Sequence, residues 1–373
     1  MFCERSMMMK KLAFGLMRLP QLDENDATSI DIERVKGMAD TFIEQGFCYF
    51  DTAAPYHGKH SEIAFREAVV KRYPRESYIV ADKLTLGMID KAEDMQSFFD
   101  GQMERTGLDY IDIYLLHALG KASYEKAQNF KAFEFAAQKK AEGKIKYIGF
   151  SFHDDYEVFE EIVNYHNWDF CQIQYNYMDT DVQAGDKGYR LTEEKGIPLV
   201  IMEPIKGGAL TGFAEDIVSM FKEQDKDASL ASWALRWVAT HPNVKVVLSG
   251  MSTEEHVKDN LHTFTPFQPL SEEEQTLVKN VVEKIKSRVK NGCTGCRYCM
   301  PCPFGVDIPT NFSIWNNYGM YNNAGGTKWR YNSLEEGKRA NQCQGCGACE
   351  EVCPQKISIR ENLAKLHEEI SAL

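Results

Sequence analysis

Short apolar runs alternate with amphipathic stretches along the first half of the chain. Four runs are rich in β-branched and aromatic residues and stop at a polar residue, which is typical of buried strands. These runs span residues 47–51, 77–83, 110–117 and 144–151. The stretches with helical spacing between them span residues 63–71, 90–106 and 124–142. The runs end at Asp51, Lys83, His117 and Ser151, which lie 32, 34 and 34 positions apart. That period predicts a repeated strand–helix unit.

The same alternation continues less regularly to about residue 260. Further candidate strands span residues 12–16, 170–174, 198–202 and 244–248, and candidate helices span residues 154–164, 228–239 and 254–261. Eight strand–helix units of this total length are typical of a (β/α)8 TIM barrel. A doubly wound open sheet is the alternative α/β fold, but it would carry a G-x-G-x-x-G turn after an early strand. The sequence has no such turn.

The repeating pattern ends around residues 266–270, where the sequence reads PFQPL. A charged helix is predicted over residues 271–290, and a cysteine-rich region follows it to the C-terminus. We therefore expect two domains, a TIM barrel over residues 1–285 and a small, mainly helical domain over residues 286–373.

The composition narrows the class of protein. Of the 373 residues 43% are hydrophobic and 26% are charged, which excludes a wholly disordered chain. Acidic residues outnumber basic ones by 55 to 43, and a net charge of −12 disfavours nucleic acid as a partner. No apolar run reaches the roughly 20 residues of a membrane helix, and the first 18 residues lack a signal-peptide core. We expect a cytoplasmic protein without a membrane partner.

Eight of the eleven cysteines lie between positions 293 and 353. Disulfides are disfavoured in a reducing compartment, so clustered thiols indicate metal binding. The first motif comprises Cys293, Cys296, Cys299 and Cys302, and the second comprises Cys343, Cys346, Cys349 and Cys353. A proline follows the last cysteine of each motif. Three thiolates at x2 spacing can bind one iron–sulfur cubane, whereas zinc sites more often use two separated pairs. The spacing predicts two [4Fe-4S] clusters.

Two features separate this region from a compact bacterial ferredoxin. The first motif has two residues before its last cysteine where the compact pattern has three, and 40 residues separate the motifs. The region resembles helical two-cluster ferredoxin modules, in which the last cysteine of each motif binds the other cluster. With that exchange, one cluster is held by Cys293, Cys296, Cys299 and Cys353. The other is held by Cys343, Cys346, Cys349 and Cys302.

The barrel also carries candidate chemistry. TIM-barrel active sites form at the C-terminal ends of the strands. Asp51, Lys83 and His117 end three successive predicted strands, and Tyr56 follows five residues after Asp51. Taken one at a time, an aspartate at a strand end is usually a helix cap, a lysine is usually solvated, and a histidine is more often a core residue. Their common position in the repeat favours an acid–base site.

Three segments that contain these residues resemble the active-site tetrad of the aldo/keto reductases. The segments read FDTAAPY (50–56), ADK (81–83) and LLH (115–117). The resemblance covers about residues 15–260, and the cysteine-rich tail extends it to a ferredoxin-fused branch of that family. It implies reversible hydride transfer between a nicotinamide and a small-molecule carbonyl or alcohol.

The resemblance also assigns a role to each member of the tetrad. Tyr56 would donate a proton to the developing alkoxide, and a nearby Lys83 would lower the pKa of that phenol. Asp51 would hold Lys83 in place, and His117 would orient the carbonyl oxygen and share in the proton transfer. Arg18 and Tyr175 are candidates for contact with a substrate carboxylate or ring, and a purely structural role is the alternative for both.

The resemblance further implies that the nicotinamide is bound extended, without a glycine-rich turn. The residues implied in dinucleotide binding are Ser151, Gln172, Met202, Gly250, His256 and Asn260. Ser151 and Gln172 would contact the carboxamide. Gly250 and His256 stand where many family members have the cations that hold a 2′-phosphate, so the choice between NADP and NAD stays open. Lys206 or Lys258 could compensate.

A second function stays open at this stage. The chain could be an iron–sulfur electron-transfer protein whose barrel is a docking or nicotinamide-sensing module, with a redox partner protein at the cluster domain. The four tetrad residues favour the enzyme. Nicotinamide transfers two electrons as hydride whereas each cluster transfers one, and the sequence shows no flavin site between them.

Overall fold

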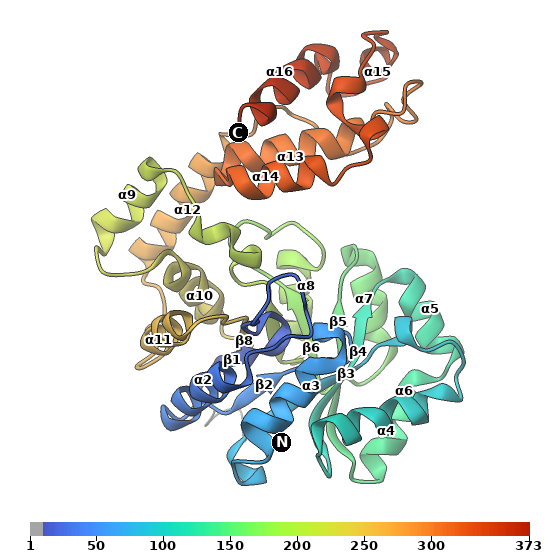
Figure 1. The fold of residues 1–373 in the computed structure, drawn as a ribbon, viewed down its shortest axis with the longest axis vertical. Coiled ribbons are helices and arrows are strands. Elements are labelled where there is room, and N and C mark those ends of the chain that lie inside the picture. The colour runs from blue at the N-terminus through green and yellow to red at the C-terminus, as the bar shows by residue number, and fades with distance from the viewer. Residues whose placement is uncertain (1–9) are drawn as a thin grey trace. The chain divides into compact units, whose positions relative to one another are not determined.

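The computed structural model describes residues 10–373, so the first nine residues of the expected barrel domain lie outside the described part. Within it, eight parallel strands close into a barrel in the order β1 to β8, and helices lie outside the ring (Figure 1). The strands are β1 Leu12–Gly15, β2 Tyr49–Asp51, β3 Ile79–Leu84, β4 Ile111–Leu119, β5 Ile145–Phe152, β6 Phe170–Gln174, β7 Leu199–Met202 and β8 Val244–Ser249. The predicted TIM barrel is confirmed.

The helices of the barrel differ from the expectation in two ways. They are α2 Ile32–Glu44, α3 His60–Phe65, α4 Asp94–Thr106, α5 Lys121–Asn129, α6 Ala132–Ala141, α7 Tyr156–Tyr165, α8 Gly185–Glu194, α10 Leu230–Thr240 and α11 Glu254–Thr263. The single helix predicted over residues 124–142 is wrong, because Lys131 adopts a left-handed φ of 54° that separates α5 from α6. Helices α2 and α8 were not among the predicted stretches.

The interior of the barrel is filled by side chains that share one phase of the strand alternation. Ile79 and Ala81 of β3 belong to this inner cluster, whereas Val80 and Leu84 pack outward against the helices. The inner phase continues to Lys83. The same alternation applies to the inner residues of β2, β4, β5 and β6, which lead to Asp51, His117, Ser151 and Gln172. Period-2 alternation therefore directs these five polar side chains into the C-terminal end of the barrel.

A second compact unit comprises residues 206–230 and 272–373. Its helices are α9 Glu215–Gln224, α12 Glu272–Lys286, α13 Ile308–Tyr321, α14 Ala324–Asn332, α15 Ala348–Glu351 and α16 Ile359–Ser371. Lys284 in the last turn of α12 and Arg288 just after this helix form ion pairs with Asp216 of α9. The segment 206–230 thus packs with the C-terminal helices, although it lies between β7 and α10 in the chain. The domain boundary after residue 285 stays a prediction.

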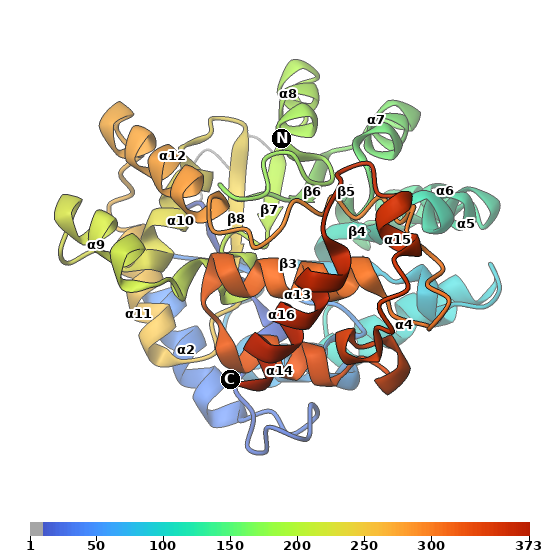
Figure 2. The ribbon, with the colours of Figure 1, turned by 90° about the horizontal axis from the view of Figure 1, so that it is seen from above.

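The second unit has its own apolar core. Helix α16 crosses α13 and α14 (Figure 2), and its Leu363, Leu366 and Ile370 are buried with Phe312 of α13. Several cysteines pack against this core. The unit is therefore mainly helical, as expected.

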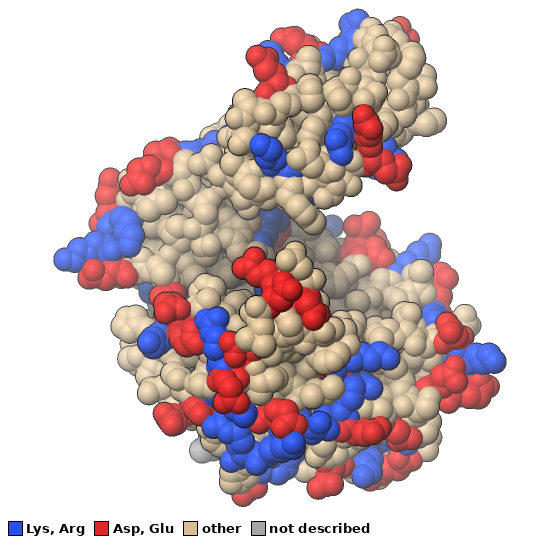
Figure 3. All heavy atoms as spheres, in the orientation of Figure 1, with Lys and Arg blue, Asp and Glu red and all other residues tan. Residues whose placement is uncertain are grey.

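The surface carries charges of both signs. Figure 3 shows acidic and basic side chains interspersed over the visible face of the barrel unit. No helix within residues 10–373 combines the length and the apolar character needed to cross a membrane.

Candidate active site and cluster sites

Lys83 is the centre of a compact polar group at the end of the barrel. Its side chain is fully buried, and its Nζ donates to Asp51 Oδ1 at 2.6 Å and to the Thr52 carbonyl oxygen at 2.8 Å. The same Nζ lies 3.3 Å from the hydroxyl oxygen of Tyr56. One ammonium therefore links the Asp51 carboxylate to the Tyr56 phenol without an intervening side chain.

Burial is the largest single influence on the pKa of Lys83 and on that of Tyr56. It lowers the pKa of Lys83, but the Asp51 carboxylate and Tyr56 outweigh it and bring that pKa above the ordinary lysine value. Burial also raises the pKa of the Tyr56 phenol, and Lys83 opposes this rise only in part. The net pKa of Tyr56 thus lies above its ordinary value, opposite in sign to the sequence expectation. The phenol is protonated at neutral pH and has a proton to give.

His117 lies beside this group. Its Nδ1 is 2.7 Å from Thr85 Oγ1, and its ring meets the Tyr56 ring edge-on with centroids 6.1 Å apart. Burial lowers the pKa of His117 to about 3, with further contributions from Lys83 and His153. The imidazole is consequently neutral at physiological pH. Thr85 orients one ring nitrogen, which leaves Nε2 for another partner.

A cleft of about 570 Å³ opens at this end of the barrel, within the size range of small-ligand sites. Of the sequence-predicted residues it brings together Asp51, Tyr56, His117, Ser151, Gln172, Met202, Gly250 and Arg18. Lys83 does not line the cleft itself, but it contacts Asp51 and Tyr56, which do. His256 and Asn260 do not line this cleft. The structure therefore gathers the tetrad and four of the six residues implied in dinucleotide binding.

Ser151 and Gln172 are suited to a carboxamide. They are register partners at the ends of β5 and β6. Ser151 Oγ accepts a hydrogen bond from the Ala118 amide at 2.7 Å, so its hydroxyl hydrogen remains to be donated. Gln172 Oε1 is buried and has no hydrogen-bond partner in the described part of the chain, while Gln172 Nε2 lies 3.6 Å from Met202 Sδ. The oxygen of a carboxamide can accept from the Ser151 hydroxyl, and its NH₂ group can donate to Gln172 Oε1.

The remaining two residues of that set lie near α11. Asn260 is buried and donates to Ser249 Oγ at 2.7 Å, which ties α11 to the end of β8. His256 is exposed, and its Nδ1 accepts from the Ser252 amide. At the start of α11, Glu254 forms a bidentate ion pair with Arg34 at 3.1 and 2.7 Å. Arg34, which reaches this helix start, is thus already paired with a carboxylate.

Two substrate-contact candidates differ in their placement. Tyr175 is buried, and its hydroxyl donates to Asp186 Oδ1 at 2.6 Å, so its structural role is the one observed. Arg18 lines the cleft with a half-exposed side chain, 4.0 Å from Glu203. Thr85 and Glu203 were missed from the sequence. The position of Thr85, two residues after Lys83 at the same strand end, was the available signal.

Four cysteines surround a cavity in the second unit. Cys293, Cys296, Cys299 and Cys353 line it, together with Ile308 and Phe312. Within residues 10–373 no three His, Cys, Asp or Glu side chains form a group that could hold a single metal ion. A cubane takes each thiolate on a different iron, so it requires a wider set of ligands than a single ion does. This donor set fits a [4Fe-4S] cluster.

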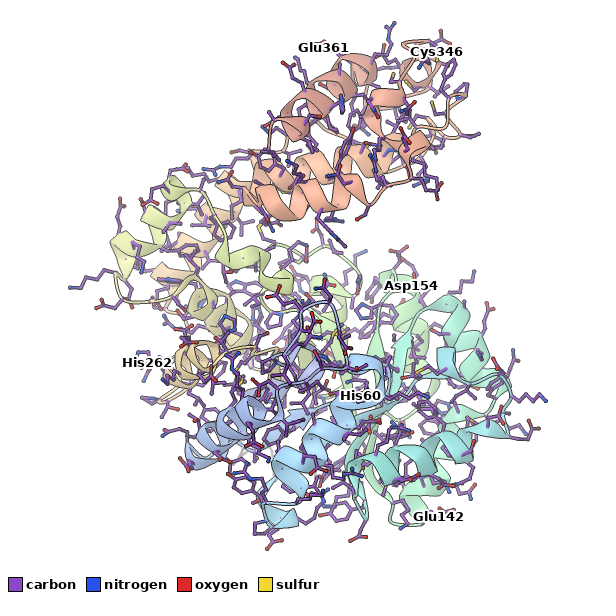
Figure 4. The ribbon with its side chains drawn as sticks, in the orientation of Figure 1. His60, Glu142, Asp154, His262, Cys346 and Glu361 are labelled. Atoms are coloured by element: carbon purple, nitrogen blue, oxygen red, sulfur yellow. The ribbon has the colours of Figure 1, made fainter. Side chains whose placement is uncertain are left out.

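The other four cysteines are more open to solvent. Cys346 is exposed in the loop before α15 (Figure 4), and Cys302, Cys343 and Cys349 are partly buried. Burial and the neighbouring Glu350 raise the pKa of Cys349 to about 11, and the Cys343 and Cys299 thiols add to this effect. Cys349 therefore lies near a thiol of each predicted set. The grouping of these four cysteines around one cluster stays a prediction.

Comparison with known families gives two matches. Residues 11–283 match the model of the aldo/keto reductase family, and residues 292–357 match that of a 4Fe-4S dicluster domain. The NADH-specific methylglyoxal reductase of Escherichia coli K12 is 24% identical over 298 residues, covering 66% of this chain and 88% of the relative. The L-galactose dehydrogenase of Arabidopsis thaliana is 25% identical over 265 residues, covering 66% and 82%.

Solved structures resemble the barrel. An aldo-keto reductase from Bacillus halodurans in its holo form has a TM-score of 0.59 and 25% identity, covering 73% of this chain and 91% of that one. An aldo-keto reductase from Klebsiella pneumoniae in complex with NADPH has a TM-score of 0.58 and 20% identity, covering 74% and 91%. The second likeness concerns the fold alone.

Proposed function

The chain belongs to the aldo/keto reductase family, and from that premise we propose that it catalyses reversible hydride transfer between NAD(P)H and an aldehyde or ketone. The observation that carries the proposal is the contact of Lys83 Nζ with both Asp51 and Tyr56 at the cleft. A nicotinamide bound there supplies a hydride to the carbonyl carbon. The residues of the chain then have to supply one proton to the carbonyl oxygen.

Tyr56 is the proton donor in this proposal. Its raised pKa keeps the phenol protonated until negative charge develops on the substrate oxygen. As the O–H bond of Tyr56 breaks, the Lys83 ammonium stabilises the phenolate, and Asp51 keeps the ammonium in place. Alcohol oxidation runs the same transfer in reverse, with the phenolate taking the proton.

His117 orients the carbonyl. A neutral imidazole fixed at Nδ1 by Thr85 can donate from Nε2 to the carbonyl oxygen without adding a full charge to the cleft. The carbonyl oxygen thereby meets two donors, the Tyr56 hydroxyl and the His117 ring. Both act where negative charge develops during hydride transfer.

We propose NADH as the preferred cofactor. Residues 248–260, which the resemblance assigns to the adenosine end, contain three acids and a single lysine, Lys258. A 2′-phosphate would therefore meet a net negative segment in which Arg34 is already paired with Glu254. NADH lacks this phosphate and avoids the repulsion.

We also propose two [4Fe-4S] clusters in the C-terminal unit, ligated as the two exchanged sets, and a redox partner protein there. The exposed Cys296 and Cys346 support this role, because a cluster near the surface can exchange single electrons. Anaerobic addition of NADH followed by electron paramagnetic resonance tests the source of these electrons. A reduced-cluster signal would contradict the need for a partner, and its absence would support it.

Replacement of Tyr56 tests the enzymatic proposal. Tyr56→Phe should lower kcat by about 10²- to 10⁴-fold, the usual contribution of a general acid, with dinucleotide affinity nearly unchanged. Tyr49→Phe is the matched control, because the buried Tyr49 hydroxyl on β2 has no hydrogen-bond partner in the described part of the chain. Methylglyoxal, the substrate named for the Escherichia coli relative, is a suitable first aldehyde. A fully active Tyr56→Phe enzyme would refute the proposal.

A further inference from the structure

The backbone pairing between β2 and β3 is interrupted at Lys83. The Thr52 amide donates to the Ala81 carbonyl oxygen at 2.9 Å, as expected for this parallel pair. The next bond of such a ladder would run from the Lys83 amide to the Thr52 carbonyl oxygen. That carbonyl instead accepts the Lys83 ammonium at 2.8 Å. The Lys83 amide donates to Asp82 Oδ1 at 2.8 Å.

Asp82 faces away from the cleft. It is fully buried on the outward phase of β3, next to Glu62 of α3, which pairs with Arg105 of α4. Burial and the nearby Glu62 charge raise the pKa of Asp82 well above its ordinary value. This buried carboxyl is tied to Lys83 by the hydrogen bond that it accepts from the main-chain amide.

The other backbone group of Lys83 is also held by a side chain. Gln102 Nε2 of α4 donates to the Lys83 carbonyl oxygen at 3.1 Å, and Tyr114 donates to Gln102 Oε1 at 2.6 Å. Asp82 of β3 and Gln102 of α4 thus hold the peptide groups on both sides of the Lys83 Cα atom. This support is outside the cleft and uses none of the residues that line it.

We propose that Asp82 is a positioning residue for Lys83. By accepting the Lys83 amide, it leaves the Thr52 carbonyl to the ammonium, which is then held by three oxygen atoms and directed at Tyr56. Without an acceptor at position 82, the Lys83 amide would close the ladder onto Thr52. The ammonium would lose one of its partners and its fixed distance from Tyr56. The inference rests on the proposed role of the tetrad.

Two substitutions at this position separate the hydrogen bond from simple burial. Asp82→Leu removes the acceptor at similar size, whereas Asp82→Asn keeps an Oδ1 acceptor. We expect Asp82→Leu to lower kcat by about 10- to 100-fold, as for a lost hydrogen bond to a charged group, and Asp82→Asn to stay near wild type. The dinucleotide dissociation constant should not change in either variant.

The pH profile provides the readout that a structural defect would not move. If Lys83 moves away, the pKa of Tyr56 rises, so the alkaline limb of kcat in Asp82→Leu should shift to higher pH. Circular dichroism establishes folding, and Asp82→Ala serves if the leucine variant does not fold. A folded leucine or alanine variant with wild-type kcat and pH profile would overturn the inference, as would equal losses in the asparagine variant. An active Tyr56→Phe enzyme would instead refute the proposed function.

Discussion

Replacing Lys83 with methionine tests the electrostatic basis of the site. The Lys83 Nζ lies 3.3 Å from the Tyr56 oxygen. At that separation and an effective dielectric constant near 20, a unit charge stabilises a full phenolate by roughly 5 kcal/mol. Each 1.4 kcal/mol corresponds to a factor of about ten in rate, so Lys83→Met should slow proton transfer by roughly 10³- to 10⁴-fold.

The same substitution should also destabilise the fold. It leaves the buried Asp51 carboxylate without its cation, and breaking such a pair costs about 3–5 kcal/mol. The double variant Asp51→Asn/Lys83→Met removes the unpaired charge. It should recover most of the free energy of unfolding while remaining inactive.

The assay follows the absorbance of the reduced nicotinamide during aldehyde reduction, together with urea unfolding of each variant. Lys146→Met is the control, because Lys146 lies near the start of β5 and pairs with Asp112 instead of the tetrad. A double variant that recovers both stability and turnover would refute the reasoning, since stability alone would then explain the loss. A single variant with near-normal kcat would do the same.

Further predictions concern the cofactors, pH and the two units. Anaerobically purified protein should contain about eight irons and eight sulfides per chain, and stoichiometric zinc without sulfide would exclude the clusters. The pKa of His117 is 6.5 in the unfolded chain and about 3 in the folded one, so the free energy of unfolding should fall as the pH drops from 6.5 to 3. His117→Gln should make this free energy less dependent on pH, as measured by unfolding titrations. NADH should give a higher kcat/KM than NADPH, with Glu254→Lys narrowing the ratio. A chain truncated after Lys290 keeps the ion pairs of Asp216 and should fold and reduce an aldehyde; a folded but inactive truncation would mean that the cluster region completes the site.

The barrel could be predicted because each parallel strand is buried on both sides and therefore reads as a short apolar run. The regular spacing of the polar residues that end these runs then indicated a repeated strand–helix unit. Helix boundaries were harder to predict. Residues 124–142 have continuous helical spacing, and only the left-handed Lys131 divides them. Lysine has no local preference for that conformation. Both helices pack against β4, and α6 packs also against β5.

The sequence was sufficient to predict site residues that lie at the ends of strands. It was not sufficient to predict properties that depend on how side chains pack in the folded barrel. Asp51, Lys83 and His117 share one place in the repeat. The raised pKa of Tyr56 depends on how deeply the folded barrel buries it, which the sequence does not express. Asp82 was overlooked for a similar reason. Asp82 lies next to Lys83 but on the opposite face of the strand. It accepts the Lys83 main-chain amide, which is available because the Thr52 carbonyl oxygen accepts the Lys83 ammonium instead.

The second unit is built from two separate segments of the chain, so it cannot be transferred to another barrel as one continuous piece. Because residues 206–230 belong to that unit, the polypeptide passes between the units at three junctions, near residues 205, 230 and 271. A graft of residues 292–373 onto another barrel would leave out both α12 and the segment that carries Asp216. A functional transplant would need the insertion after β7 as well as the tail.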